Sequence, residues 1–313
     1  MDDKRVTSAS EFLELIKLYQ SEFGQSCPSG NFIFRGVGSP EYQLLPKVFR
    51  VEIAKKGAKD FVRGESILDI VYADSEFKVL ESFRKSASAF LPSTLSYGTF
   101  SLMQYAQHYG VPTRLLDFTT SPLTALHFCC KSKNDTDGVL WIMNVTNFKK
   151  WTVAGIDGTD PLYGDPKNWS CERMINNVME EVTDDINLYE GFVKVHRPIF
   201  FLPTYIDSRM SGQASCFLVW GWNHNALETM VEQNNWMDSD VDSMGEKDED
   251  DQRFLAKIII PKEHKRSILN ELDMIGVNEK AIFPGLDGIG QYLERRHQTG
   301  LTIESASFED VGD

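Results

Sequence analysis

The chain has few of the residues that mark secreted, metal-binding or membrane proteins. Its five cysteines form no CxxC pair and stand at no zinc-ligand spacing from a histidine, which disfavours a disulfide framework and a structural zinc site. No run of about 18 apolar residues occurs, as a membrane-spanning helix would need. The start, MDDKRVTSASEF, also has no apolar signal-peptide segment. We therefore expect a soluble cytoplasmic protein.

Basic residues are also fewer than acidic ones. The 32 Lys and Arg residues face 46 Asp and Glu residues, and the net charge is −14. Affinity for nucleic acid depends largely on cationic side chains that displace counterions from phosphates. The charge balance therefore disfavours a surface that coats a duplex, although it leaves room for a local basic groove.

What the chain does contain is apolar and aromatic material, at 42% and 12% of its 313 residues, which is enough for a substantial core. Apolar spacing and turn residues predict helices from Ser8 or Ser10 to before Gly24 and at residues 64–86, 100–109, 122–131, 267–274 and 286–296. They predict strands at residues 31–36, 113–118, 139–145, 199–202, 216–220 and 254–260, and a helical turn near 207–213. No regular βαβ rhythm is present, so we expect an α+β fold with an irregular mixed or antiparallel sheet and surrounding helices.

Two segments look like excursions from this core. Residues 152–170 are rich in Gly, Asp and Pro and predict a loop or insertion. Residues 238–251 carry eight acidic residues and one lysine, which is typical of a mobile surface loop. Asp238, Asp240, Asp242 and Glu249 have the spacing of a calcium loop, but Ser243 stands where such a loop needs glycine. A mobile acidic loop is the favoured interpretation.

Three polar groups interrupt the apolar pattern: Arg35 at a strand end beside Gly36, the run from Gln107 to Ser121, and Arg209 with Gln213. Burying such groups without partners costs about several kcal/mol each. A guanidinium can hold two phosphate oxygens at once, and a glycine beside it lets a ligand approach the backbone. The sequence therefore predicts one polar pocket that gathers these segments.

The same segments carry a resemblance to a known family. Phe34-Arg35-Gly36 resembles the motif that names the FRG domain, and the run from Gln104 to Phe128 resembles its second signature. Arg209-Met-Ser-Gly-Gln213 followed by Phe217, and residues 282–288, resemble two later elements of that family. The resemblance spans about residues 10–295 and implies a single FRG-type domain over 1–313. Phe118 replaces the usual tryptophan, and Ser215 stands where glycine is typical.

The resemblance also implies a fold and a ligand. The layout of the FRG family is similar to ADP-ribosyltransferase folds, which bind NAD. By that analogy Arg35 and Gly36 meet a phosphate, Thr119 and Thr120 lie beside the nicotinamide ribose, and Gln213 takes the third position. Tyr109, Arg114 and Arg209 complete the residues expected to contact the nucleotide.

Cleavage of the nicotinamide bond would need a carboxylate, because it builds an oxocarbenium-like cation. Gln213 cannot supply that charge, whereas Asp117, or Glu228 from a following helix, could. His108 is a candidate general acid or base. Simpler interpretations compete: a buried structural pair of Arg114 with Asp117, and an ordinary helix-end role for His108.

The leading hypothesis from sequence is an NAD-binding protein that transfers ADP-ribose or cleaves NAD, as the family resemblance implies, in a bacterial toxin or phage-defence setting. We expect a protein as acceptor or partner, and neither a membrane nor a metal. The alternatives are a non-catalytic module that binds a nucleotide or a protein, and a nuclease. Nucleic acid is disfavoured as a ligand by the negative charge.

Overall fold

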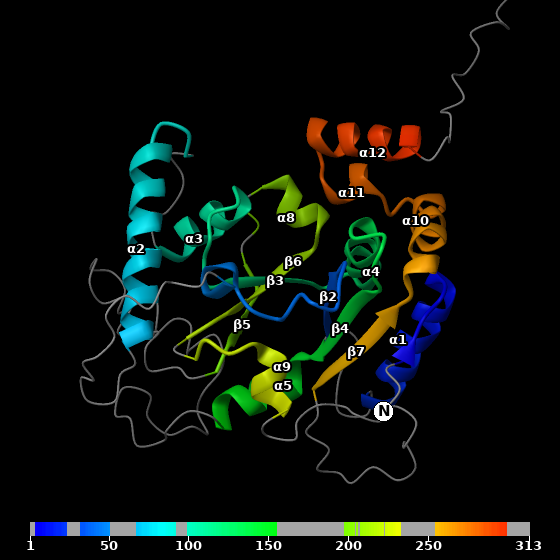
Figure 1. Cartoon of the computed structure of the whole chain (residues 1–313), viewed down its shortest axis with the longest axis horizontal. Coiled ribbons are helices and arrows are strands. Elements are labelled where there is room, and N and C mark those ends of the chain that lie inside the picture. Colours follow the sequence, from blue (N-terminus) through cyan, green and yellow to red (C-terminus); the bar gives the residue numbers. More distant parts are fainter. Residues whose placement is uncertain are drawn as a thin grey trace, which may run out of the picture.

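The computed structural model of the protein is built around a seven-stranded sheet, and it describes residues 4–23, 32–50, 67–91, 99–154, 197–203, 205, 207–221, 223–232 and 254–298 (Figure 1). The strands are β1 (Lys4–Arg5), β2 (Phe32–Val37), β3 (Leu115–Thr119), β4 (Gly138–Asn144), β5 (Ile199–Phe201), β6 (Ser215–Val219) and β7 (Leu255–Ile260). Their order is β1-β7-β4-β2-β3-β6-β5, with β1 parallel to β7 and the other neighbours antiparallel. The predicted mixed sheet with surrounding helices is confirmed.

Helices cover both faces of the sheet because side chains alternate along each strand. On β2, Phe32 and Phe34 face one core and Ile33 and Val37 face the other. The first core is closed by α1 (Ala9–Phe23), α4 (Pro122–Lys131) and α10 (Lys265–Met274). The second is closed by the short helix η1 (Lys47–Arg50), α5 (Val145–Ala154) and α9 (Leu227–Glu232).

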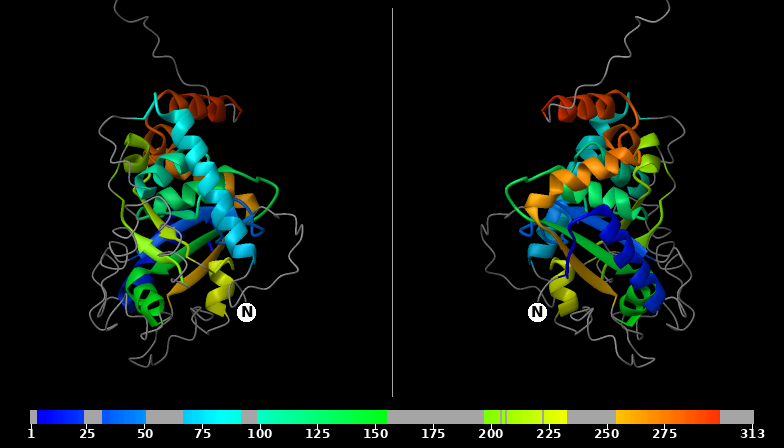
Figure 2. Two further views of the ribbon diagram at one scale, coloured as in Figure 1. Left: turned by 90° about the vertical axis from the view of Figure 1, so that its left-hand side faces the viewer. Right: turned by 90° about the vertical axis from the view of Figure 1, so that its right-hand side faces the viewer.

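The remaining helices lie around the ends of the sheet. They are α2 (Ile67–Ala87), α3 (Thr99–His108), α8 (Ser208–Gly212), η4 (Lys262–His264), α11 (Glu279–Ile282) and α12 (Leu286–Gln298). Figure 2 shows α12 at one end of the molecule, beyond the sheet. Among the helices described, none has the length and apolar content needed to cross a bilayer.

Local signals in the sequence account for several element boundaries. Ser121 caps α4 by accepting a hydrogen bond from the Thr124 amide, with Pro122 at the first helical position. Ser8 accepts from the Glu11 amide at the start of α1. Gly110 has a φ of +83° just past the end of α3, where a glycine relieves the steric cost of the left-handed conformation. These predicted starts and stops are confirmed.

The predicted loop at residues 152–170 is wrong at its beginning. Helix α5 continues to Ala154 because Trp151 and Thr152 are buried, and the Thr152 hydroxyl donates to the carbonyl of Pro198. The Gly, Asp and Pro residues that suggested a loop all come after the end of this helix. The rest of that segment and the acidic segment 238–251, with its calcium alternative, lie outside the described residues.

Helix α4 packs unusually close to the sheet, and glycine makes this possible. A Cβ atom on Gly36 would lie 1.8 Å from the carbonyl oxygen of Ala125, and one on Gly138 would lie 2.8 Å from that of Cys129. Both obstacles are helix backbone, which cannot turn aside as a side chain can. The position of α4 on β2 and β4 therefore depends on the missing side chains.

Gly36→Ala should lower the free energy of unfolding by at least about 1–3 kcal/mol, because the added methyl group must push α4 off the sheet. Gly290→Ala is the matched control: no atom lies within 4 Å of the point that its added methyl group would occupy on α12, and alanine favours a helix by about 1 kcal/mol. Urea unfolding followed by circular dichroism measures both. Equal stability of the Gly36 variant and the wild type would contradict the packing argument.

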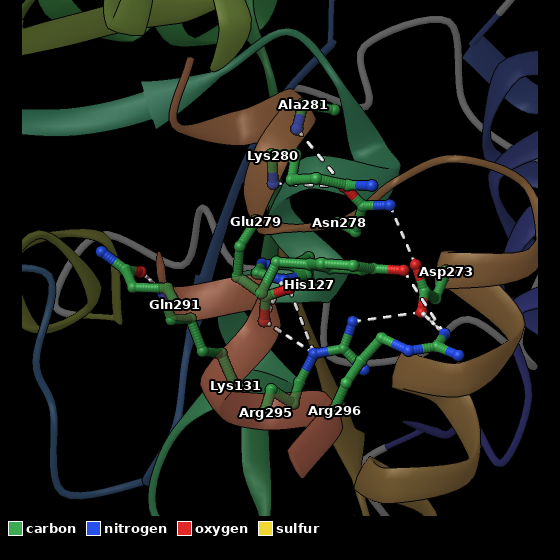
Figure 3. A network of polar contacts seen from close by, with 11 residues as sticks. His127, Lys131, Asp273, Asn278, Glu279, Lys280, Ala281, Gln291, Arg295 and Arg296 are labelled. Carbon is green, nitrogen blue, oxygen red and sulfur yellow. Dashed lines mark hydrogen bonds and ion pairs between the residues drawn. The ribbon is translucent and has the colours of Figure 1, made fainter. Parts of the chain in front are cut away.

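The short helix α11 is held by a buried carboxylate, that of Glu279. It lies 3.5 Å from Nε2 of His127 on α4 and accepts a 2.9 Å hydrogen bond from Arg295 on α12 (Figure 3). Burial acts to raise the pKa of Glu279, but the contacts with His127 and Arg295 outweigh it and lower the pKa to about 2. The charged carboxylate therefore links α4, α11 and α12.

Acid should weaken this link. The folded pKa of Glu279 lies below its unfolded value, so its stabilising effect is complete above about pH 5 and is lost as the pH falls toward 2. Glu279→Gln should be less stable than the wild type at neutral pH, and this gap should narrow on the order of 1 kcal/mol by about pH 3.5. Urea unfolding at the two pH values tests this, and a constant or widening gap would refute it.

Candidate functional site

A cavity of about 290 Å³ opens on the α4 face of the sheet, between α4, α3 and α8. It is lined by Phe34, Arg35, Gly36, Gln104, Gln107, His108, Asp117, Phe118, Thr119, Phe128, Arg209, Met210, Gln213, Ser215 and Phe217. Aromatic walls and a few polar groups are typical of a small-molecule site. All three polar segments singled out in the sequence contribute to it.

The cavity forms where two strands in the middle of the sheet separate. β2 and β3 pair only at Phe34 and Thr119, while β3 continues along β6 and β2 along β4. Arg35 is the next residue of β2, and its Nη1 donates a hydrogen bond to the backbone carbonyl of Asp117. The guanidinium thus bridges two strands that no longer hydrogen-bond to each other.

Arg35 and Arg209 are the two arginines among the residues that line the cavity, and the Arg35 guanidinium also interacts with Arg50 and Glu228 on the opposite face of the sheet. Burial lowers the pKa of the Arg35 guanidinium to about 10, partly offset by Asp117, so the group stays charged at neutral pH. Its Nε is buried and has no hydrogen-bond partner. A charged, desolvated donor that lacks a partner favours an anionic ligand.

Asp117 and Thr119 point to the same face of β3 because they are two residues apart. The Asp117 side chain is exposed, whereas Thr119 is buried. The Thr119 hydroxyl donates to the carbonyl of Gln213 at 2.6 Å and accepts from the Ser121 amide. Thr119 therefore fixes the Gln213 turn against β3 rather than standing free for a ligand.

Gln213 ends α8 and lines the cavity, with its Nε2 buried and without a partner. The left-handed residue of this turn is Ala214, with a φ of +46°, whereas Ser215 is the first residue of β6 and pairs with Thr119. The serine at the usual glycine position therefore does not loosen the turn.

His108, the last residue of α3, is oriented by a carboxylate that was not predicted from the sequence. Its Nδ1 lies 3.1 Å from Oδ2 of Asp207, whose Oδ1 accepts the Met210 amide and caps α8. One aspartate thus fixes both the helix and the imidazole, leaving Nε2 as the nitrogen that can serve a ligand. The position of Asp207 just before a helical turn, typical of an N-cap, was the available signal.

Gln104 is a second cavity residue that was not predicted from the sequence. It lies on α3 three and four residues before Gln107 and His108, so these side chains share one helix face. Gln104 is 5% exposed and its Oε1 has no hydrogen-bond partner. A polar stripe at helical spacing on an otherwise apolar helix could have identified it.

Three residues expected at the ligand lie outside the cavity. Tyr109 is exposed, and Thr120 is exposed with its hydroxyl 3.4 Å from the Ala214 carbonyl. Arg114 is buried and forms a 2.7 Å ion pair with Glu76 of α2. The structural role considered for Arg114 therefore holds, but its partner is Glu76 and not Asp117.

Glu228 also lies away from the cavity. It belongs to α9 on the opposite face, and both of its carboxylate oxygens accept the Leu44 amide at 3.1 Å. Burial raises the pKa of Glu228. Asp117 is therefore the only carboxylate among the residues that line the cavity as the structure describes it.

The described parts of the chain contain no group of three or more His, Cys, Asp or Glu side chains that could hold a metal ion. What the cavity offers instead is a desolvated guanidinium, two partnerless amide atoms, an imidazole and one carboxylate. These groups suit a ligand with a phosphate and a hydrogen-bonding ring substituent.

Comparison with family models shows that residues 30–138, which include ten of the fifteen residues that line the cavity, match the FRG domain. The chain contains an FRG domain. The match runs from β2 to the first residue of β4 and includes Arg35, His108 and Asp117, whereas Arg209 and Gln213 fall outside it. No curated protein and no solved structure matches the chain.

Asp207 should matter to stability through its cap on α8. Asp207→Ala should lower the free energy of unfolding by about 1 kcal/mol, whereas Asp207→Asn keeps a capping oxygen and should cost less. Denaturant unfolding of both variants measures this. Equal losses for alanine and asparagine would show that the cap contributes little.

Proposed function

We propose that this protein binds an NAD-like dinucleotide in the FRG-domain cavity and cleaves its nicotinamide–ribose bond. The observation that carries the proposal is a set of buried polar atoms without partners: Arg35 Nε, Gln104 Oε1 and Gln213 Nε2. One is cationic, one accepts and one donates. A ligand that reaches these atoms would satisfy them, and the gain is sizeable because buried polar groups without partners cost about 1–3 kcal/mol each.

The two amide atoms complement a primary carboxamide. The carboxamide NH₂ group of nicotinamide would donate to Gln104 Oε1, and its carbonyl would accept from Gln213 Nε2. Phe128 and Phe217 in the wall provide aromatic surface for the ring. This pairing of a donor with an acceptor favours nicotinamide over a ligand that carries only phosphate.

The size of the cavity places the rest of the ligand outside it. A volume of about 290 Å³ is at the lower end for ligand pockets, which span about 300–1,000 Å³. We expect the cavity to hold the nicotinamide riboside half, with the phosphates at Arg35 and Arg209. The Arg209 guanidinium lies 5.0 Å from the Phe283 ring, which orients it at the wall.

In the proposed reaction the glycosidic C–N bond breaks, and its electron pair leaves with nicotinamide as a neutral molecule. The cation that forms on the ribose is stabilised by the Asp117 carboxylate. Water or an acceptor hydroxyl then attacks the same carbon, and its proton passes to His108, which Asp207 orients. Such an activity would suit the bacterial toxin or phage-defence setting that the family resemblance implies.

A second function is supported by the exposure of Asp117. Solvent screens an exposed charge, so this carboxylate stabilises a cation less than a buried one would. The same cavity could then hold a nucleotide without cleaving it. The protein would act as a binding module in which the ligand controls a partner.

Nicotinamide release from NAD, followed by chromatography, distinguishes the two functions. Asp117→Asn should reduce release by about 100-fold or more while NAD binding persists, because the carboxylate acts on the transition state. Gln213→Ala should weaken NAD binding by about tenfold, as expected for one lost hydrogen bond to the ligand. Asp287→Asn, an exposed change on α12, is the control with the same loss of charge.

Calorimetry with NAD supplies the second readout. Binding that Arg35→Gln removes, without any nicotinamide release by the wild type, would establish the binding module in place of the enzyme. An absence of both binding and release would overturn the proposal altogether.

A further inference from the structure

A second cavity, separate from the first, lies between α10, α12 and the end of α4. Its volume is about 560 Å³, within the range of small-molecule pockets. Positions 262, 266, 269 and 270 line it from η4 and α10, and 291, 294, 295 and 298 line it from α12. These spacings of three and four residues put one face of each helix against the cavity. We call it the basic groove.

The groove is positive although the chain is acidic. It is lined by two carboxylates, Glu279 and Glu294, and by five cationic side chains: Lys131, Lys262, Lys265, Arg266 and Arg295. The whole chain carries a net charge of −14. Such a local excess of positive charge raises the concentration of anions near it.

Two of these cations are held without a carboxylate as hydrogen-bond partner. Lys265 is 1% exposed, and its ammonium donates to the carbonyls of Gly38, Ser132 and Lys133. Lys131 donates to the amide oxygen of Gln291. Carbonyl and amide oxygens carry no formal charge, so both ammonium groups remain positive sources at the groove.

One carboxylate of the groove is already engaged. Glu279 contacts His127 and Arg295, and Arg295 also lies 3.3 Å from Asp273 (Figure 3). The opposite charges of this network largely offset each other at the wall of the groove. The pKa of Lys131 is lowered, mainly by burial. Glu279 acts to raise this pKa, whereas the neighbouring cations Arg209 and Arg295 act to lower it.

The basic groove and the FRG-domain cavity share no lining residue, and the ring of Phe283 contacts a cation of each. The Lys131 ammonium lies 4.2 Å from the centre of this ring, and the Arg209 guanidinium lies 5.0 Å from it. Phe283 also packs against Phe128, a wall residue of the cavity. Each site therefore contributes one cation that lies against the Phe283 ring.

We propose that the basic groove binds a small phosphate-bearing molecule that also carries hydroxyl groups. Lys131, Lys262 and Arg266 would hold the phosphate. The amides of Asn134, Asn270 and Gln298 and the Glu294 carboxylate, all at the groove, would meet the hydroxyls. A long polyanion fits less well, because the rest of the acidic surface repels it.

Calorimetry on the full chain tests this with inorganic pyrophosphate as the probe. Lys262→Gln combined with Arg266→Gln removes two exposed cations of the groove and keeps good helix formers. Pyrophosphate binding should weaken by about tenfold or more, because charge-assisted hydrogen bonds are lost. The control, Lys17→Gln combined with Lys85→Gln, removes the same charge from exposed sites on α1 and α2 and should bind like the wild type.

Arg35→Gln separates the basic groove from the FRG-domain cavity. It should leave pyrophosphate binding at the groove unchanged, whatever its effect on NAD. Loss of pyrophosphate binding in Arg35→Gln alone would move the anion site to the cavity and overturn this proposal. No measurable binding by the wild type, or equal weakening by the control pair, would overturn it as well.

Discussion

The close approach of α4 to the sheet is the constraint on which both sites depend. The helix backbone occupies the space where Gly36 and Gly138 would otherwise carry side chains. At that depth Phe128 reaches the FRG-domain cavity, and Lys131, one turn later, reaches the basic groove. A helix displaced by one methyl group would move both residues together. The packing of α4 against the sheet therefore also determines where these two side chains lie at the two sites.

The second constraint is the separation of β2 from β3. A sheet that opens in its middle leaves backbone groups without strand partners, and such groups are costly when buried. Arg35 relieves part of this cost by donating to the Asp117 carbonyl, and it does so with a guanidinium that can make further hydrogen bonds. Arg35 therefore both links the separated strands and carries a positive charge that can attract an anion. Structural and binding roles for Arg35 are complementary.

The sequence predicts best what is decided locally. The Ser121 cap, the Gly110 stop and the apolar faces of most helices follow from a few neighbouring residues, and the polar segments were correctly expected to meet. Contacts between residues far apart in the sequence could not be predicted: Arg114 pairs with Glu76, 38 residues away, and His108 pairs with Asp207. From the sequence alone, several carboxylates were equally plausible partners for Arg114 and for His108. Helix α5 was not predicted, and its last residues were assigned to a loop, because composition says nothing about the burial of Trp151.

The distribution of charge also follows from the fold and not from composition. The net charge of −14 disfavoured an extended basic surface but left room for a local basic groove, and packing of α10 against α4 and α12 gathers five cations around one such groove. Burying Lys265 beneath that groove is costly unless its three donors are satisfied, and three carbonyls from two loops satisfy them. Those carbonyls hold the ammonium but leave its charge in place. The fold thus preserves a positive site that acidic residues elsewhere on the chain do not neutralise.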